Sequence, residues 1–98
     1  MRFKVIVEKR ALTDLSNAYE YYNKQKSGLG KTFISAANKC FITLSKNPFY
    51  QIRYDSVRCV PFSKFPFMVH FKVDENSKTV KVFAVIHTSL NPETKWLK

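Results

Sequence analysis

The sequence predicts an α+β domain in which a helical hairpin packs on a mainly antiparallel, twisted sheet. Apolar residues recur every three or four positions in residues 9–25 and again in residues 29–46, which indicates two amphipathic helices. Apolar and polar residues alternate at the start of the chain and through most of residues 57–87, which indicates strands. The predicted order is therefore β-α-α-β-β-β. The 98 residues fit one domain that spans residues 1–98.

In the first strand, Phe3, Val5 and Val7 point to one face and make it apolar. Ile6 points to the other face together with charged residues. The period then changes to that of a helix, which we expect to run to about Gln25. Its predicted apolar stripe consists of Leu12, Leu15, Tyr19 and Tyr22, with Ala11 and Ala18 beside them.

The second helix follows a break at Ser27-Gly28 and ends at Asn47-Pro48, because proline disfavours helix in the residue before it. We expect Gly28 and Gly30 to permit the tight turn between the two helices. The predicted stripe of the second helix is Leu29, Phe33, Ala36, Ala37, Cys40, Phe41 and Leu44. A connection this short predicts an antiparallel pair of helices.

Three strands are predicted after Pro48, and the first covers residues 57–62 beyond a polar break at Asp55-Ser56. The second presents Phe65, Phe67, Val69, Phe71 and Val73 on one face and Met68, His70 and Lys72 on the other. A polar turn then leads to the third, in which Val80, Val82, Ala84 and Ile86 alternate with Lys81, Phe83, Val85 and His87. Asn91-Pro92 opens a short turn or helix that ends at Trp96.

The charge of the chain is strongly positive, with 17 Lys and Arg, seven Asp and Glu, and a formal net charge of +10. Such a bias favours anionic partners such as nucleic acid, a ribosome or an acidic protein, although a basic but inert surface is the alternative. We expect Cys40 and Cys59 to be reduced core residues, and the His and Cys residues lack the spacing of metal ligands. No signal-peptide run or membrane-span length is present, so a soluble cytoplasmic protein is expected.

Several ordered motifs resemble the RelE/ParE family of toxins from type II toxin–antitoxin systems. They are Ala11-x-x-Asp14-Leu15, Tyr21-Tyr22, Gly28-Leu29-Gly30-x-x-Phe33, Asn47-Pro48, Arg58, Phe65-Pro66-Phe67, Val82-x-Ala84-Val85-x-His87 and Asn91-Pro92-x-x-x-Trp96. The resemblance covers nearly the whole chain. It implies a growth-inhibiting toxin with a role in plasmid stabilisation, neutralised by a co-encoded acidic antitoxin, and it implies no cofactor.

Two mechanisms occur among these relatives. The RelE type cleaves messenger RNA on the ribosome without a metal, which requires acid–base and phosphate-binding side chains on one face. On that hypothesis His87 serves as acid or base and Arg58 contacts the phosphate, while Arg53, Lys64 and Lys72 line the same face as nucleic-acid or partner contacts.

The ParE type instead binds DNA gyrase and traps it on cleaved DNA, which requires an interface and no catalytic residue. This sequence has Met68 and Leu90 where ribonuclease relatives carry basic residues, so the ParE type is favoured. A ribosome-dependent endoribonuclease and a basic RNA-binding module remain the alternatives, and whether the chain is an enzyme stays open.

Overall fold

The computed structural model describes residues 2–89, so the expectations for Leu90, Asn91-Pro92 and Trp96 lie outside the described residues. The elements are β1 (Lys4–Val7), α1 (Lys9–Gln25), α2 (Leu29–Lys46), β2 (Ile52–Tyr54), β3 (Val57–Pro61), β4 (Phe67–Asp74) and β5 (Thr79–His87). The predicted α+β order is confirmed, and the short strand β2 is an addition to it. No helix within residues 2–89 has the length and apolar character needed to cross a membrane.

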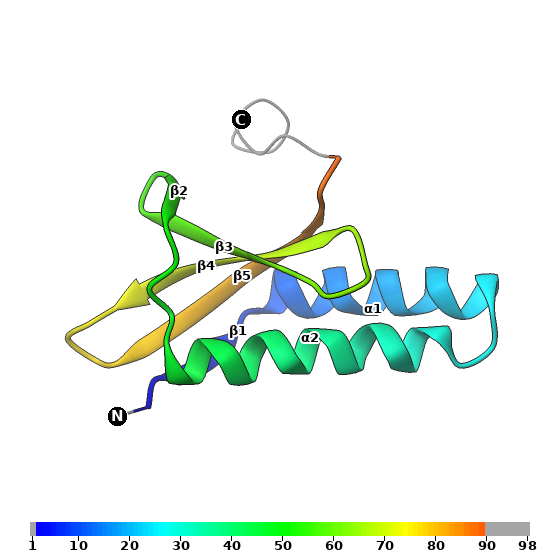
Figure 1. Cartoon of the computed structure of the whole chain (residues 1–98), viewed down its shortest axis with the longest axis horizontal. Helices are drawn as coiled ribbons and strands as arrows, with labels where there is room; N and C mark the ends of the chain where they lie inside the picture. The colour runs from blue at the N-terminus through cyan, green and yellow to red at the C-terminus, as the bar shows by residue number, and fades with distance from the viewer. Residues whose placement is uncertain (1, 90–98) are drawn as a thin grey trace.

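The strands form one sheet in the order β1-β5-β4-β3-β2, and both helices cover the same face of it (Figure 1). β1 pairs in parallel with β5, whereas β5-β4, β4-β3 and β3-β2 are antiparallel. The two helices connect β1 to β2, which lies at the opposite edge of the sheet. This long connection allows β1 to pair in parallel with β5, a strand that is distant from it in sequence. The mainly antiparallel sheet is therefore confirmed.

The core lies between the helices and the sheet and contains many aromatic rings. Phe33 of α2 is fully buried and stacks on Phe62 with ring centroids 5.0 Å apart. Phe71 and Val69 of β4 are also fully buried, while Phe67 and Val73 pack against the core with part of their surface exposed. The strand phase predicted for residues 67–73 is thus confirmed.

The phase predicted for β5 is correct only as far as Phe83. His70 pairs with Ala84 and Phe71 pairs with Val82, so Phe83 is an extra residue in a β-bulge. After the bulge Val85 belongs to the core under the helices, and Ala84 and Ile86 are buried on the opposite face. The expectation that Ala84 and Ile86 share a face with Val80 and Val82 was wrong because one inserted residue inverts a period of two.

Two expectations for the helices are also corrected. Leu12 and Tyr19 lie outside the buried stripe with 54% and 36% of their surfaces exposed, because the small residues Ala11 and Ala18 face the sheet in their place. Only Gly28 serves the turn, with φ at +87° before the first residue of α2. Gly30 lies inside α2, where an added Cβ would come within 2.7 Å of the Tyr19 carbonyl oxygen, so it permits close helix packing.

We predict that Phe71→Ala lowers the free energy of unfolding by about 3–5 kcal/mol, because it removes a fully buried ring from the core. Phe67→Ala should cost less, since part of that ring is exposed. Leu12→Ala is the matched control and should change stability by no more than about 0.5 kcal/mol. Urea denaturation of the three variants measures the differences. Equal stability of Phe71→Ala and the parent chain would contradict the strand phase.

Candidate functional site

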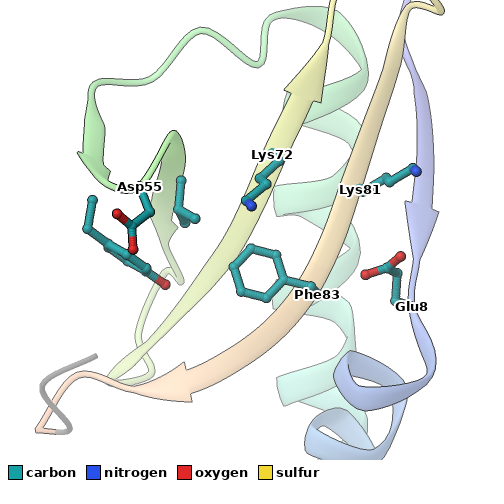
Figure 2. A pocket seen from close by; sticks show the side chains of 7 residues that line it. Glu8, Asp55, Lys72, Lys81 and Phe83 are labelled. Carbon is teal, nitrogen blue, oxygen red and sulfur yellow. The ribbon is translucent and has the colours of Figure 1, made fainter. Parts of the chain in front are cut away.

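The sheet face turned away from the helices, here called the far face, carries a pocket of about 260 Å³. The residues that line it are Glu8, Tyr54, Asp55, Val57, Lys72, Lys81 and Phe83. Figure 2 shows the Phe83 ring at the centre, with Asp55 on one side of it and Glu8 and Lys81 on the other. The pocket thus combines an aromatic surface with charges of both signs.

The β-bulge and the β4–β5 turn position the central side chains of this pocket. Phe83, the extra residue of the bulge, directly follows the core residue Val82 and lies on the far face. The Asp74 carboxylate accepts hydrogen bonds from the backbone N–H groups of Asn76 and Ser77, which fixes the turn between the strands. That turn places Lys72 directly opposite Lys81 in the strand register. Like charges at opposite positions repel each other, so the pair favours an anion between them.

A buried polar cluster lies beneath the pocket and consists of Tyr54, Cys59 and His70. The Tyr54 hydroxyl and Nδ1 of His70 form a hydrogen bond at 2.8 Å, and Sγ of Cys59 lies 3.4 Å from the same nitrogen. His70 is 4% exposed and Cys59 is 7% exposed. Both cysteines of the chain are free and buried, which confirms the expectation that they are reduced core residues.

The three groups of this cluster are held in their neutral forms. Burial, reinforced by the positive charges of Arg10 and Arg53, lowers the pKa of His70 to about 4. Burial raises the pKa of the Cys59 thiol to about 11, and it also raises the pKa of Tyr54. A protonated hydroxyl and a protonated thiol beside a neutral imidazole form a structural network without an activated nucleophile.

The structure does not bring the two predicted catalytic residues together. Arg58 pairs with Phe71 and His87 pairs with Phe67, so the two positions differ by about 13 Å along the strands, with β4 between them. The Arg58 guanidinium donates to the Tyr50 carbonyl at 2.7 Å.

His87 also lies on a different face from the one expected. The inverted phase beyond the bulge places its ring edge-on to Phe67, with centroids 5.3 Å apart, on the helix side of the sheet. Its Nδ1 accepts a hydrogen bond from the backbone N–H of Ser89 at 3.0 Å.

The predicted contact residues separate into two groups. Lys72 lines the far-face pocket, and the charge of Arg53 acts on the buried cluster below it. Lys64 lies instead beside α2, where it lines a small hollow with Thr32 and Lys39. Within residues 2–89 no group of three or more His, Cys, Asp or Glu side chains could hold a metal ion.

Most of the far-face site was missed from the sequence. Lys81 could have been found, because the turn after Asp74 fixes its position opposite Lys72. Phe83 could also have been found, because it shares the predicted strand phase of Lys81. Glu8, Tyr54 and Asp55 belong to segments distant from β4 and β5 in the sequence, and no motif links them.

Comparisons with known proteins identify one family and a shared fold. Residues 5–92 match the family model described as the ParE toxin of the type II toxin–antitoxin system parDE. The fold is similar to a chain of the chromosomal ParDE system from P. aeruginosa, with a TM-score of 0.77 and 14% identity over 87% of this chain and 95% of that one. No curated protein matches the sequence.

Two RelBE complexes share the fold less closely. A chain of RelBE2 from Mycobacterium tuberculosis gives a TM-score of 0.63 at 15% identity, covering 89% of this chain and 99% of that one. A chain of the intact E. coli RelBE complex gives 0.65 at 15% identity, covering 85% and 93%.

We predict that His70 makes the fold sensitive to acid. Its folded pKa of about 4 lies below the ordinary value of 6.5, so the unfolded chain binds the proton first. The stability that depends on neutral His70 is complete above pH 6.5 and is lost progressively as the pH falls toward 4. Denaturant titrations of the parent chain and His70→Gln at pH 7 and pH 5 measure this. The parent should lose more stability between the two pH values, and equal losses would contradict the prediction.

Proposed function

Because the chain belongs to the ParE toxin family of type II toxin–antitoxin systems, we propose that it inhibits growth by binding DNA gyrase and that a co-encoded acidic antitoxin neutralises it. The match over residues 5–92 is the observation that carries the proposal. A gyrase inhibitor of this kind acts through a protein interface and needs no catalytic group. The separation of Arg58 from His87 supports that mechanism over RNA cleavage.

The surface of the described residues suits a protein partner. Large apolar side chains are about half exposed on the helices and after them, among them Leu12, Tyr21, Ile42 and Phe49. Such side chains supply apolar anchors when a partner covers them, and the +10 charge of the chain accelerates encounter with an acidic partner. Both properties support a tight complex with an antitoxin that buries at least about 1,200 Å².

We predict that the purified chain binds the acidic protein encoded in the adjacent reading frame. Leu12→Ala or Ile42→Ala should weaken the complex by about 2 kcal/mol, or roughly 30-fold in Kd, where that side chain is an interface anchor. Calorimetric titration measures the affinity, and Lys24→Ala on an exposed site of α1 is the control. Absence of any complex with the adjacent gene product would contradict the antitoxin part of the proposal.

The gyrase mechanism predicts that His87→Ala remains toxic, because a strand-end histidine packed on Phe67 is not an interface anchor. Toxicity is measured as growth arrest at matched expression without antitoxin, with DNA breaks and transcript integrity recorded in the same cultures. DNA breaks with intact transcripts are expected for both the parent chain and the variant. Melting temperature confirms that the variant is folded.

A ribonuclease that uses His87 as acid or base would behave differently. Cleavage should then fall about 10²–10⁴-fold in a folded His87→Ala variant, and toxicity should fall with it. That result would replace the gyrase mechanism with ribosome-dependent cleavage of messenger RNA.

A further inference from the structure

A second hollow lies between α2 and the loop that joins β3 to β4 (Figure 1). Its volume is about 90 Å³, and the residues that line it are Thr32, Ser35, Ala36, Lys39, Ser63, Lys64 and Phe65. We propose that it binds a terminal phosphate group, either free inorganic phosphate or the phosphate of a small phosphorylated molecule. The proposal does not depend on gyrase as the target or on the antitoxin.

The lining of the hollow is positive and rich in hydrogen-bond donors. Lys39 and Lys64 carry two positive charges, and Thr32, Ser35 and Ser63 each carry a hydroxyl group. No Asp or Glu is among the lining residues. The two walls come from residues 21–54 and residues 56–73, and neither segment contains a carboxylate. An anion from outside the chain is therefore the counterion that this lining fits.

Most of these donors are not used inside the fold. Within residues 2–89, no hydrogen bond or ion pair involves the side chains of Ser35, Lys39, Ser63 or Lys64. The Thr32 hydroxyl makes only a long contact of 3.5 Å to a backbone carbonyl of its own helix. An anion that enters the hollow therefore displaces water from these groups and breaks no contact that holds the fold together.

The two walls are held in place by the core. The Phe65 ring lies edge-on to Phe33 of α2 and to Tyr22 of α1, with centroids 5.2 Å and 4.9 Å apart. Sγ of Cys40 on α2 lies 3.7 Å from the carbonyl oxygen of Pro61, the last residue of β3. These contacts fix the loop against the helix, so an anion can bind without first ordering a segment of the chain.

The backbone of Lys64 also indicates a role for its side chain. Its φ is +72°, in the left-handed region that favours glycine. The Phe62 N–H donates to the Phe67 carbonyl at 2.9 Å and closes the loop around this residue. A lysine in this conformation costs stability that a glycine would not, and such positions cluster at ligand sites. Compared with glycine, lysine adds an ammonium group that lines the hollow.

A terminal phosphate matches this lining better than a carboxylate or a phosphodiester does. It carries a charge of about −1.5 to −2 at pH 7 and three strong acceptor oxygens, which suit two ammonium groups and their neighbouring hydroxyls. A carboxylate offers one charge and two oxygens. A phosphodiester offers one charge and extends from the phosphorus in two directions. The hollow is also far smaller than the ~300–1,000 Å³ of sites that enclose drug-sized ligands, so the rest of a phosphorylated molecule would stay in solvent.

The test is calorimetric titration of the purified chain with inorganic phosphate, glycerol phosphate and dimethyl phosphate at constant ionic strength. We expect the tighter of the first two to bind with a Kd of about 1 mM, as two or three charge-assisted hydrogen bonds allow once the cost of immobilising the ion is included. The preference between these two probes identifies the source of the phosphate. Dimethyl phosphate, which has a single charge, should bind at least about 10-fold more weakly. Shifts of the amide NMR signals of residues 32–39 and 63–65 place the ion in the hollow.

Three variants test the named donors. The double variant Lys39→Gln, Lys64→Gln should weaken phosphate binding about 10- to 100-fold, and Ser63→Ala should weaken it about 5-fold, because hydrogen bonds to a charged group are lost. Lys64→Gly guards against loss of the fold, since glycine suits the backbone at that position. It should weaken binding about 10-fold without lowering the melting temperature.

The control is the double variant Lys4→Gln, Lys9→Gln, which makes the same charge change at exposed sites on β1 and at the start of α1, outside the hollow. Its Kd should stay close to that of the parent chain. The proposal is overturned if this control weakens binding as much as Lys39→Gln, Lys64→Gln does, or if dimethyl phosphate binds as tightly as the other probes. It is also overturned if neither inorganic phosphate nor glycerol phosphate shifts the amide signals of the hollow.

Discussion

The fold depends on one hydrogen bond between α1 and the bulged strand β5, in which the Val85 N–H donates to the Asp14 carboxylate at 2.9 Å. β1 pairs with β5 only up to Val82, because the chain turns into α1 directly after β1. Beyond that point the edge of β5 has no strand to receive its donor. A buried amide without an acceptor is costly, so a helix carboxylate takes the place of the missing strand. Asp14 therefore connects the helical layer to the strand at the residue where its register changes.

The bulge divides β5 into two halves, in which the alternation of side chains between the two faces of the sheet has opposite phase. Before the bulge Val80 and Val82 pack under the helices, and after it Val85 and His87 do so. Phe83 itself turns to the far face, where it becomes the centre of the pocket. A continuous strand would have left His87 on the far face, whereas Phe83, which directly follows the core residue Val82, faces away from the helices in either case. The extra residue thus removes the predicted catalytic histidine from the far face, where Phe83 supplies an aromatic surface.

The limits of prediction from the sequence follow from the same physics. Periodicity predicted the helices and the phase of β4, because Phe33, Val69 and Phe71 bury large side chains in a regular pattern. It misassigned Leu12 because the helix approaches the sheet closely through its small residues Ala11 and Ala18. The face that carries these residues is buried, although Leu12 has the larger apolar side chain. It could not predict the bulge, because β5 is apolar on both faces around Ala84 and either phase satisfies the pattern. The edge strand β2 has only three residues, too few to show a period.

The far-face site lay beyond prediction for a different reason, which concerns charge. Lys72 and Lys81 line it from β4 and β5 and follow from local register, whereas the positive charges of Arg10 on α1 and Arg53 on β2, which lower the pKa of His70, come from segments distant in the sequence. A protonated His70 among these cations would add repulsion beneath an already basic surface. Burial prevents this by keeping the imidazole neutral, with the Tyr54 hydroxyl and the Cys59 thiol within hydrogen-bond distance of its Nδ1. The neutral cluster therefore keeps a buried charge out of the sheet beneath the exposed side chains of Lys72 and Lys81.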